Sequence, residues 1–138
     1  MKRYIIDTNA LISYVTDRNP EQQRKVAGIF QEAGQLRGLI LCPQNVLTEF
    51  IFVLDKVYGV PKKEIQMMAK DFLAMPGIEM VHEIDFATVF NFWPEPILDF
   101  GDAIIASLAS VYKGSIILTF DLKFFHTIKK LRVPIKTL

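Results

Sequence analysis

Three aspartates lie where an α/β chain can bring carboxylates together. Asp7 directly follows the apolar run Tyr4-Ile5-Ile6. Asp121 follows the run Ser115 to Thr119, which is rich in β-branched residues, with one Phe in between. Both runs are typical of strands, and Asp102 lies in the first turn of the apolar helical stretch that precedes the second of them. Ligands of open parallel sheets bind beyond the carboxyl ends of the strands. We therefore expect these three carboxylates at one edge of a sheet.

Glu49 is a fourth candidate, and its surroundings are unusual for a charged residue. It lies in a predicted helix, residues 43–58, whose apolar residues cover most of the circumference. Such a helix is expected to be largely buried. An ionised carboxylate there is costly unless it meets a cation or a hydrogen-bond partner. The simpler alternative is that Glu49 faces solvent.

Carboxylates that converge on one crevice repel each other and raise each other's pKa values. A hard divalent cation such as Mg²⁺ relieves that repulsion, because it takes oxygen ligands, keeps several waters and needs few carboxylates. A site of this kind binds phosphate oxygens and activates a water. The four acids together therefore predict a metal-dependent site that acts on phosphates.

Each aspartate also has a purely structural explanation. Asp7 or Thr8 can cap the helix that follows, Asp99 with Asp102 resembles a capping box, and Asp121 can cap the next helix. Negative charge near a helix N-terminus is also favoured by the helix dipole. Capping is the more common role for each aspartate taken singly, whereas the set as a whole favours a shared site.

Other catalytic chemistries have few residues to work with. Cys42 is the only cysteine, and His82 and His126 are far apart in the sequence, so no zinc-binding spacing is present. There is no Gly-rich phosphate-binding loop, and neither histidine lies in a nucleophile signature. A single cysteine excludes an internal disulfide and favours a reducing compartment.

Length and composition predict one folded domain, residues 1–138, in which 51% of the residues are hydrophobic. No apolar run approaches the ~20 residues that a membrane span needs. The opening MKRYIID lacks the apolar segment of a signal peptide, so we expect a cytoplasmic protein with no membrane association. The net charge of +1 does not indicate a nucleic-acid binder. Basic residues nevertheless follow Asp121, and Lys123, Lys129 and Lys130 are candidates either for RNA contacts or for a solvated helix end.

Short apolar runs alternate with helical patterns along the chain. This alternation predicts βαβ units, a parallel sheet and right-handed crossovers. The predicted strands are 4–6, 39–41, 78–81, 115–119 and 133–135, and the predicted helices are 10–15, 21–34, 43–58, 61–73, 86–93, 99–112 and a short one after residue 121.

These residues resemble the PIN-domain ribonucleases over nearly the whole chain. The resemblance rests on four segments, which are Asp7-Thr8-Asn9, the apolar helix around Glu49, Asp99-Phe100-Gly101-Asp102-Ala103-Ile104-Ile105-Ala106, and Thr119-Phe120-Asp121-Leu122-Lys123-Phe124. No segment is specific alone, but their order and spacing in a chain of this length make the resemblance strong.

The resemblance implies an α/β fold, namely a three-layer α/β/α sandwich with a central, mainly parallel sheet. It also implies one or two Mg²⁺ or Mn²⁺ ions and hydrolysis of RNA phosphodiester bonds. Asp7, Glu49, Asp102 and Asp121 match the acidic quartet of the family. Asp7 and Asp102 would bind the metal directly, and Glu49 and Asp121 would complete the site directly or through water.

Further positions match residues that hold the carboxylates in place. Thr8, Asn9 and Thr119 would have this supporting role. Asp99 would be another such residue or only the cap of its helix. Residues 65–80 and 82–96 carry no hallmark of the family, so they give no indication of the substrate.

The short chain resembles the toxin half of VapBC-type toxin–antitoxin pairs. This implies a homodimer that is inhibited by a small antitoxin protein, with a segment of the antitoxin entering the acidic groove. The exposed part of the helix around residues 50–58 would serve such contacts, unless it is buried in the core.

Three alternatives remain at the level of the sequence. A related nuclease could use the same site on structured DNA or on RNA-processing intermediates. A catalytically silent PIN-like module would only bind a partner, although it would have no reason to keep the repelling charges. A phosphatase with an aspartyl nucleophile usually has a second aspartate two residues after the first, where this chain has Asn9.

Overall fold

Five parallel strands form the central sheet of the computed structural model, which describes residues 1–137. Their order across the sheet is β3-β2-β1-β4-β5, and each neighbouring pair is parallel. The strands are β1 (Lys2–Ile6), β2 (Gly38–Pro43), β3 (Ile78–Val81), β4 (Ile116–Thr119) and β5 (Ile135–Thr137).

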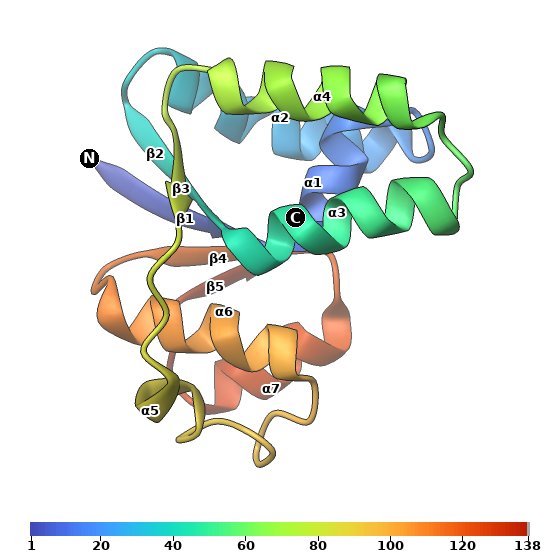
Figure 1. Cartoon of the computed structure of the whole chain (residues 1–138). Coiled ribbons are helices and arrows are strands. Elements are labelled where there is room, and N and C mark those ends of the chain that lie inside the picture. Colours follow the sequence, from blue (N-terminus) through green and yellow to red (C-terminus); the bar gives the residue numbers. More distant parts are fainter. Residues whose placement is uncertain (138) are drawn as a thin grey trace.

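Helices cover both faces of this sheet. Figure 1 shows α1 to α4 above the sheet and α5 to α7 below it. The helices are α1 (Thr8–Val15), α2 (Pro20–Gly34), α3 (Gln44–Lys56), α4 (Lys62–Ala74), α5 (Phe86–Val89), α6 (Phe100–Val111) and α7 (Leu122–Lys130). The arrangement confirms the predicted three-layer α/β/α sandwich around a parallel sheet.

The two strands at the centre of the sheet are buried on both faces. Ile5 and Ile6 of β1 and Ile117 and Leu118 of β4 are each 0% exposed. Parallel strands that are covered by helices on both sides require continuous apolar runs of this kind. The same property made these segments recognisable as strands in the sequence.

The chain changes direction across the sheet between β1 and β4. From β1 it forms β2 and β3 on one side, and it then returns to form β4 and β5 on the other. Helices leave β1 and β4 toward opposite faces of the sheet (Figure 1). Such a switch point opens a crevice at the carboxyl ends of the two strands, which is where open α/β folds bind ligands.

Two predicted helices differ from the structure. The helix expected at 86–93 ends at Val89 and continues only as turns, in which the Phe92 N–H donates to the Val89 carbonyl at 2.9 Å.

The helix around Glu49 was expected to be largely buried, and this was wrong. Only Val46, Phe50 and Leu54 of α3 are buried, whereas Ile51 and Phe52 are 41% and 58% exposed. A single stripe of α3 at i, i+4 spacing therefore covers the core. Leu47 and Val53 are partly buried beside this stripe. Among residues 1–137, no helix has both the length and the apolar character that crossing a membrane requires.

Candidate active site

Asp7 lies at the junction between the central strand β1 and the first helix. Its backbone N–H donates to the Leu118 carbonyl at 2.9 Å, so the pairing of β1 with β4 continues up to this residue. The side chain is 6% exposed. Its Oδ1 accepts a hydrogen bond from the Thr8 N–H at 2.8 Å, and its Oδ2 accepts one from the Thr119 hydroxyl at 2.7 Å. Both carboxylate oxygens are therefore fixed in direction.

Asn9 and Thr119 connect the ends of β1 and β4. The Asn9 Nδ2 lies 3.3 Å from both Asp7 Oδ2 and Thr119 Oγ1. The Asn9 Oδ1 accepts from the Phe120 N–H at 2.9 Å, and Thr119 Oγ1 accepts from the Asp121 N–H at 3.0 Å. These bonds place Asp121 relative to Asp7, although the two segments are far apart in the sequence.

Asp121 and Asp99 begin the helices α7 and α6. Asp121 Oδ1 accepts from the Phe124 N–H at 3.1 Å, and Asp99 Oδ1 accepts from the Asp102 N–H at 2.9 Å. Both residues are exposed. Within the described part of the chain, the second carboxylate oxygen of each makes no hydrogen bond. Each aspartate therefore caps a helix with one oxygen and leaves the other available to a ligand.

Asp102 lies in the first turn of α6 and is half-buried. Gly101 precedes it, and a Cβ at this position would lie 3.2 Å from Asp99 Oδ1, which is closer than an ordinary contact. The glycine therefore leaves room for the Asp99 carboxylate that caps α6.

Glu49 is exposed on α3, which agrees with the alternative that it faces solvent. The Thr8 hydroxyl donates to its Oε2 at 3.2 Å. This contact joins α3 to the start of α1, one residue from Asp7. Glu49 therefore has both the hydrogen-bond partner and the access to solvent that an ionised carboxylate needs.

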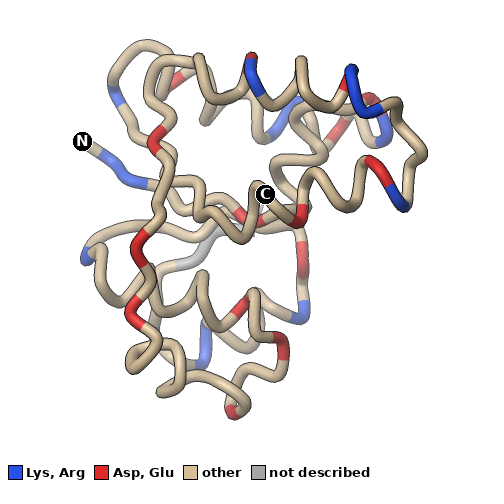
Figure 2. Tube along the Cα trace, viewed as in Figure 1, with Lys and Arg blue, Asp and Glu red and all other residues tan. Residues whose placement is uncertain are grey.

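All of the predicted acids line one cavity of about 270 Å³, which we call the first cavity. Its acidic lining residues are Asp7, Glu49, Asp99, Asp102 and Asp121. A second cavity, also of about 270 Å³, shares the last three of these and extends along Leu98, Lys123 and Thr127. Figure 2 shows acidic positions from both helical layers along this edge of the sheet. The two cavities have Asp99, Asp102 and Asp121 in common, so the acids lie between them.

The electrostatic environment opposes ionisation of the two least exposed acids. Burial raises the pKa of Asp7 to about 6; hydrogen bonds from Thr119 and from the Thr8 N–H oppose this rise, and the charges of Glu49 and Asp121 add to it. Burial, together with the negative charges of Asp7, Asp99, Asp121 and Glu49, raises the pKa of Asp102 to about 8. Mutual repulsion of the kind expected from the sequence is therefore present.

The donor set fits a hard divalent cation. Among residues 1–137, no three His, Cys, Asp or Glu side chains are close enough to hold one ion by themselves. Mg²⁺ typically binds one or two carboxylates and keeps several waters, so it does not need three. Oxygen ligands and carboxylates with raised pKa values suit such an ion, because a cation favours their ionised form.

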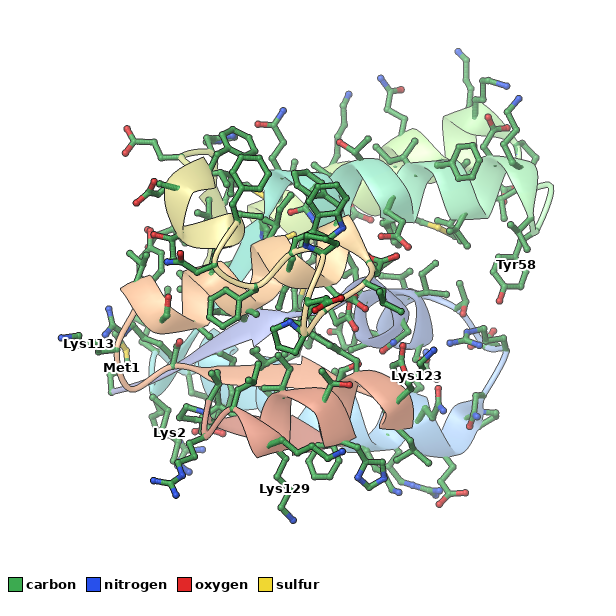
Figure 3. The ribbon with its side chains drawn as sticks, turned by 90° about the horizontal axis from the view of Figure 1, so that it is seen from below. Met1, Lys2, Tyr58, Lys113, Lys123 and Lys129 are labelled. Atoms are coloured by element: carbon green, nitrogen blue, oxygen red, sulfur yellow. The ribbon has the colours of Figure 1, made fainter. Side chains whose placement is uncertain are left out.

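Cations also lie at this edge of the sheet. Lys123 lines the second cavity, whereas Lys129 and Lys130 form the last turn of α7 and line neither cavity. In Figure 3, the Lys129 side chain points away from the ribbon. Arg18 lines the first cavity together with Tyr58. The sequence offers no reason to single out Arg18, because nothing in its local pattern indicates which way a loop side chain points.

Comparisons with known proteins agree with this architecture. The PIN domain family matches residues 4–130. The crystal structure of VapBC2 from Rickettsia felis bound to a DNA fragment from their promoter contains a similar chain, with a TM-score of 0.69, 16% sequence identity and coverage of 98% of each chain. The structure of the PIN domain endonuclease Utp24 is similar with a TM-score of 0.56 and 18% identity, covering 99% of this chain and 84% of that one. No curated protein sequence matches this chain.

Identities this low show a shared fold and nothing more specific. The family match is independent of them, and it spans every element from β1 to α7, including the four acids of the predicted quartet. The chain therefore belongs to the PIN domain family.

Proposed function

We propose that this protein is a Mg²⁺- or Mn²⁺-dependent endoribonuclease that hydrolyses RNA phosphodiester bonds. The observation that carries the proposal is the first cavity, where carboxylates from the end of β1, from α3 and from the starts of α6 and α7 meet. So much negative charge would repel an RNA backbone in the absence of a cation. With a divalent ion bound, the same cavity would attract phosphate.

Each residue has a role that follows from its position. Asp7 and Asp102 would bind the ion, because they are the two acids whose ionisation a cation would assist most. Glu49 and Asp121 are more exposed and would complete the site directly or through water, and either would orient the attacking water. The bound ion would polarise the scissile phosphate and lower the pKa of that water.

The supporting residues keep these carboxylates in place. Thr119 and Asn9 hold Asp7, and Thr8 holds Glu49. Asp99 fixes the start of α6 and therefore the position of Asp102. A correctly placed hydrogen bond of this kind restricts the direction of the carboxylate lone pairs, which is the usual contribution of residues behind a metal ligand.

The first experiment is cleavage of a panel of labelled structured RNAs with Mg²⁺, with Mn²⁺ and with EDTA. Asp7→Asn is expected to abolish cleavage while remaining folded, and Asp17→Asn is the matched control because Asp17 is exposed and lies outside the first cavity. Cleavage by Asp7→Asn at the rate of the unmutated protein would show that the site is wrong. Cleavage of DNA flaps alone would favour the structure-specific nuclease, and metal binding without any cleavage would favour the silent module.

We further infer that the protein is the toxin of a toxin–antitoxin pair, that it acts in the cytoplasm, and that it forms a homodimer. The inference that another protein chain binds here is supported by an apolar cavity of about 330 Å³ between α3 and α4. Its apolar lining residues are Ile51, Ile65, Ala69 and Leu73. Phe52 and Met67 on the same two helices are 58% and 63% exposed. Contiguous apolar surface of this kind marks protein interaction sites.

The toxin role is tested in cells. Induced expression of the unmutated chain is expected to arrest growth, and Asp7→Asn is expected to be harmless at the same protein level. The toxin role also predicts a short reading frame upstream of this one, whose product should restore growth and copurify with this chain. Growth that is unaffected by the unmutated chain would contradict the toxin role while leaving the nuclease to be decided by the cleavage experiment.

A further inference from the structure

Among residues 1–137, Arg18 is the one cation that lines the first cavity. It lies in the loop between α1 and α2, and the other charged residues of that lining are the five carboxylates. Lys123 has the corresponding position in the second cavity. The two cavities share Asp99, Asp102 and Asp121, so Arg18 and Lys123 line two cavities that meet at these three carboxylates.

The Arg18 side chain is held by a short chain of hydrogen bonds. Its Nη2 donates to the Ser13 hydroxyl at 3.0 Å, and that hydroxyl donates to Gln22 Oε1 at 2.7 Å. Ser13 is 0% exposed on α1, the helix that Asp7 begins. The Gln22 N–H donates to Asn19 Oδ1 at 3.0 Å, so the start of α2 is fixed as well. The guanidinium is thus tied to the same helix as the central carboxylate.

The charge of Arg18 is not neutralised by the neighbouring acids. The ion pairs found within residues 1–137 join Lys25 to Glu21 and join Asp55 to Lys56 and Lys62. A guanidinium has five N–H donors in a planar fork, and in the described part of the chain Arg18 uses one hydrogen bond. The remaining donors have the geometry that binds a phosphate through two oxygens.

We propose that Arg18 binds a backbone phosphate of the RNA strand next to the scissile one and so positions the strand across the carboxylates. The inference rests on the proposed nuclease function. The strand then passes from Arg18 over the acidic centre toward Lys123, and each cation binds a phosphate on its own side of the cleavage site. Ser13 and Gln22 are positioning residues, because they fix the guanidinium without contacting the strand.

Binding is measured first in the unmutated protein, with Ca²⁺ in place of Mg²⁺, so that every proposed metal ligand is kept and a divalent cation occupies the carboxylates. The probe is a fluorescein-labelled RNA hairpin with a single-stranded loop, and its anisotropy is followed at increasing KCl. Arg18→Ala is expected to weaken binding about tenfold, which corresponds to the loss of a charged hydrogen bond. The slope of log K against log salt should fall by about 0.7, the value for one lost contact to a single-stranded phosphate.

Arg24→Ala is the matched control. Arg24 has the same side chain, is exposed on α2 and lines neither cavity. Its replacement should leave both the affinity and the salt slope unchanged. If Arg18→Ala lowers the melting temperature but keeps the salt slope, Arg18 has only a structural role and the inference is overturned.

Cleavage kinetics, measured with Asp7 intact, distinguish the effect of the charge of Arg18 from the effect of its planar geometry. Arg18→Lys should restore the salt slope but only part of kcat/KM, because an ammonium lacks the planar fork. Ser13→Ala should keep the slope and lower kcat/KM, since the charge remains while its anchor is lost. Unchanged kinetics in Ser13→Ala would contradict the positioning role.

Two different outcomes would contradict the phosphate-binding role of Arg18 and the proposed nuclease function. If the unmutated protein cleaves RNA, and Arg18→Ala matches it in KM, kcat and salt slope, the inference fails and the nuclease stands. If the unmutated protein neither binds nor cleaves any RNA of the panel, both fail together.

Discussion

At the scale of single residues, helix capping and membership of a shared site are compatible. Asp7, Asp99 and Asp121 each cap a helix, and each also lines the first cavity. The two roles coincide because a helix that follows a parallel strand begins at the carboxyl edge of the sheet. The sequence could therefore predict the cavity from the positions of the aspartates, even though each one alone was explained by capping.

Asp102 leads to a prediction about stability and pH. Its pKa is raised from 3.8 to about 8, so the folded protein keeps a proton that the unfolded chain has already lost in this range. The free energy of unfolding should therefore fall as the pH rises through that window. Thermal melting in EDTA measures it. Asp102→Asn should flatten the decline, and Mg²⁺ should reduce it by favouring the ionised carboxylate.

Asp17→Asn serves as the control for this experiment, because an exposed acid outside the cavity should leave the pH profile unchanged. A melting temperature that rises with pH in EDTA would contradict the raised pKa of Asp102. The raised pKa would also be contradicted if the melting temperature of the unmutated protein did not change with pH and matched that of Asp102→Asn.

The residue that sequence reasoning could not identify is Arg18. The carboxylates follow predicted strands or begin predicted helices, so their positions are fixed by regular geometry. Arg18 lies in a loop, and its direction depends on Ser13 and Gln22, whose own contacts depend on how α1 packs against α2. No spacing rule relates these three side chains.

At the scale of elements, two glycines make opposite predictions about stability. Gly77 precedes β3 with a φ of +80°, and a Cβ there would lie 2.4 Å from the Ala33 carbonyl oxygen at the end of α2. Gly77→Ala should therefore lower the free energy of unfolding by about 2 kcal/mol or more. Gly28 lies within α2 with open space where a Cβ would be, so Gly28→Ala should raise it by roughly 0.5–1 kcal/mol. Urea denaturation measures both values.

Equal effects of the two glycine substitutions would contradict the contact between α2 and the start of β3. The comparison is informative because both changes add one methyl group. Only the backbone conformation and the distance to Ala33 distinguish them.

The helix α7 gives a graded prediction for RNA binding. Lys123 lies in its first turn and lines the second cavity, whereas Lys129 and Lys130 lie in its last turn. A helix rises about 1.5 Å per residue, so the last turn is roughly 10 Å farther along the axis. Lys123→Ala should reduce the salt slope of RNA binding more than Lys129→Ala with Lys130→Ala does. An equal or larger effect of the double variant would place the RNA along the whole helix.

The surfaces of α3 and α5 show what an apolar pattern does not determine. Both segments are rich in apolar residues, yet Phe52, Phe86 and Phe90 are each more than half exposed. Phe86 and Phe90 form a ring cluster with Trp93 and Phe100, at the start of α6 beside Asp99. Hydrophobicity alone could not separate burial in the core from exposure on a surface, because the packing partners of each helix decide between them.

At the scale of the whole molecule, the alternation of strands and helices predicted the layers and the parallel sheet. The strand order β3-β2-β1-β4-β5 was not predicted, because several orders satisfy the same alternation and the same right-handed crossovers. This order matters for the site, since it makes β1 and β4 neighbours. The Thr119 hydroxyl therefore reaches Asp7 Oδ2 at 2.7 Å.

The proposed homodimer can be tested through the exposed face of α3. Phe52 is 58% exposed, and Phe52→Glu should shift the protein toward the monomer in sedimentation velocity over a range of concentrations, because burying a charge opposes association. Val111→Glu is the matched control at 55% exposure on α6. A dimer that persists in Phe52→Glu but dissociates in Val111→Glu would move the interface to the other helical layer. A monomer at every concentration would contradict the homodimer.

The pairing of β1 with β4 also determines when the site can form during synthesis. Asp7 is synthesised before its partner Thr119 and the neighbouring Asp121, which lie 112 and 114 residues later in the chain. Nascent chains emerge from the ribosome N-terminal part first. A chain that has not yet released β4 has no neighbour for β1 and no hydroxyl to fix Asp7. The acidic cavity can therefore form only after β4 and Asp121 have been synthesised, because until then Asp7 lacks the hydroxyl that fixes it.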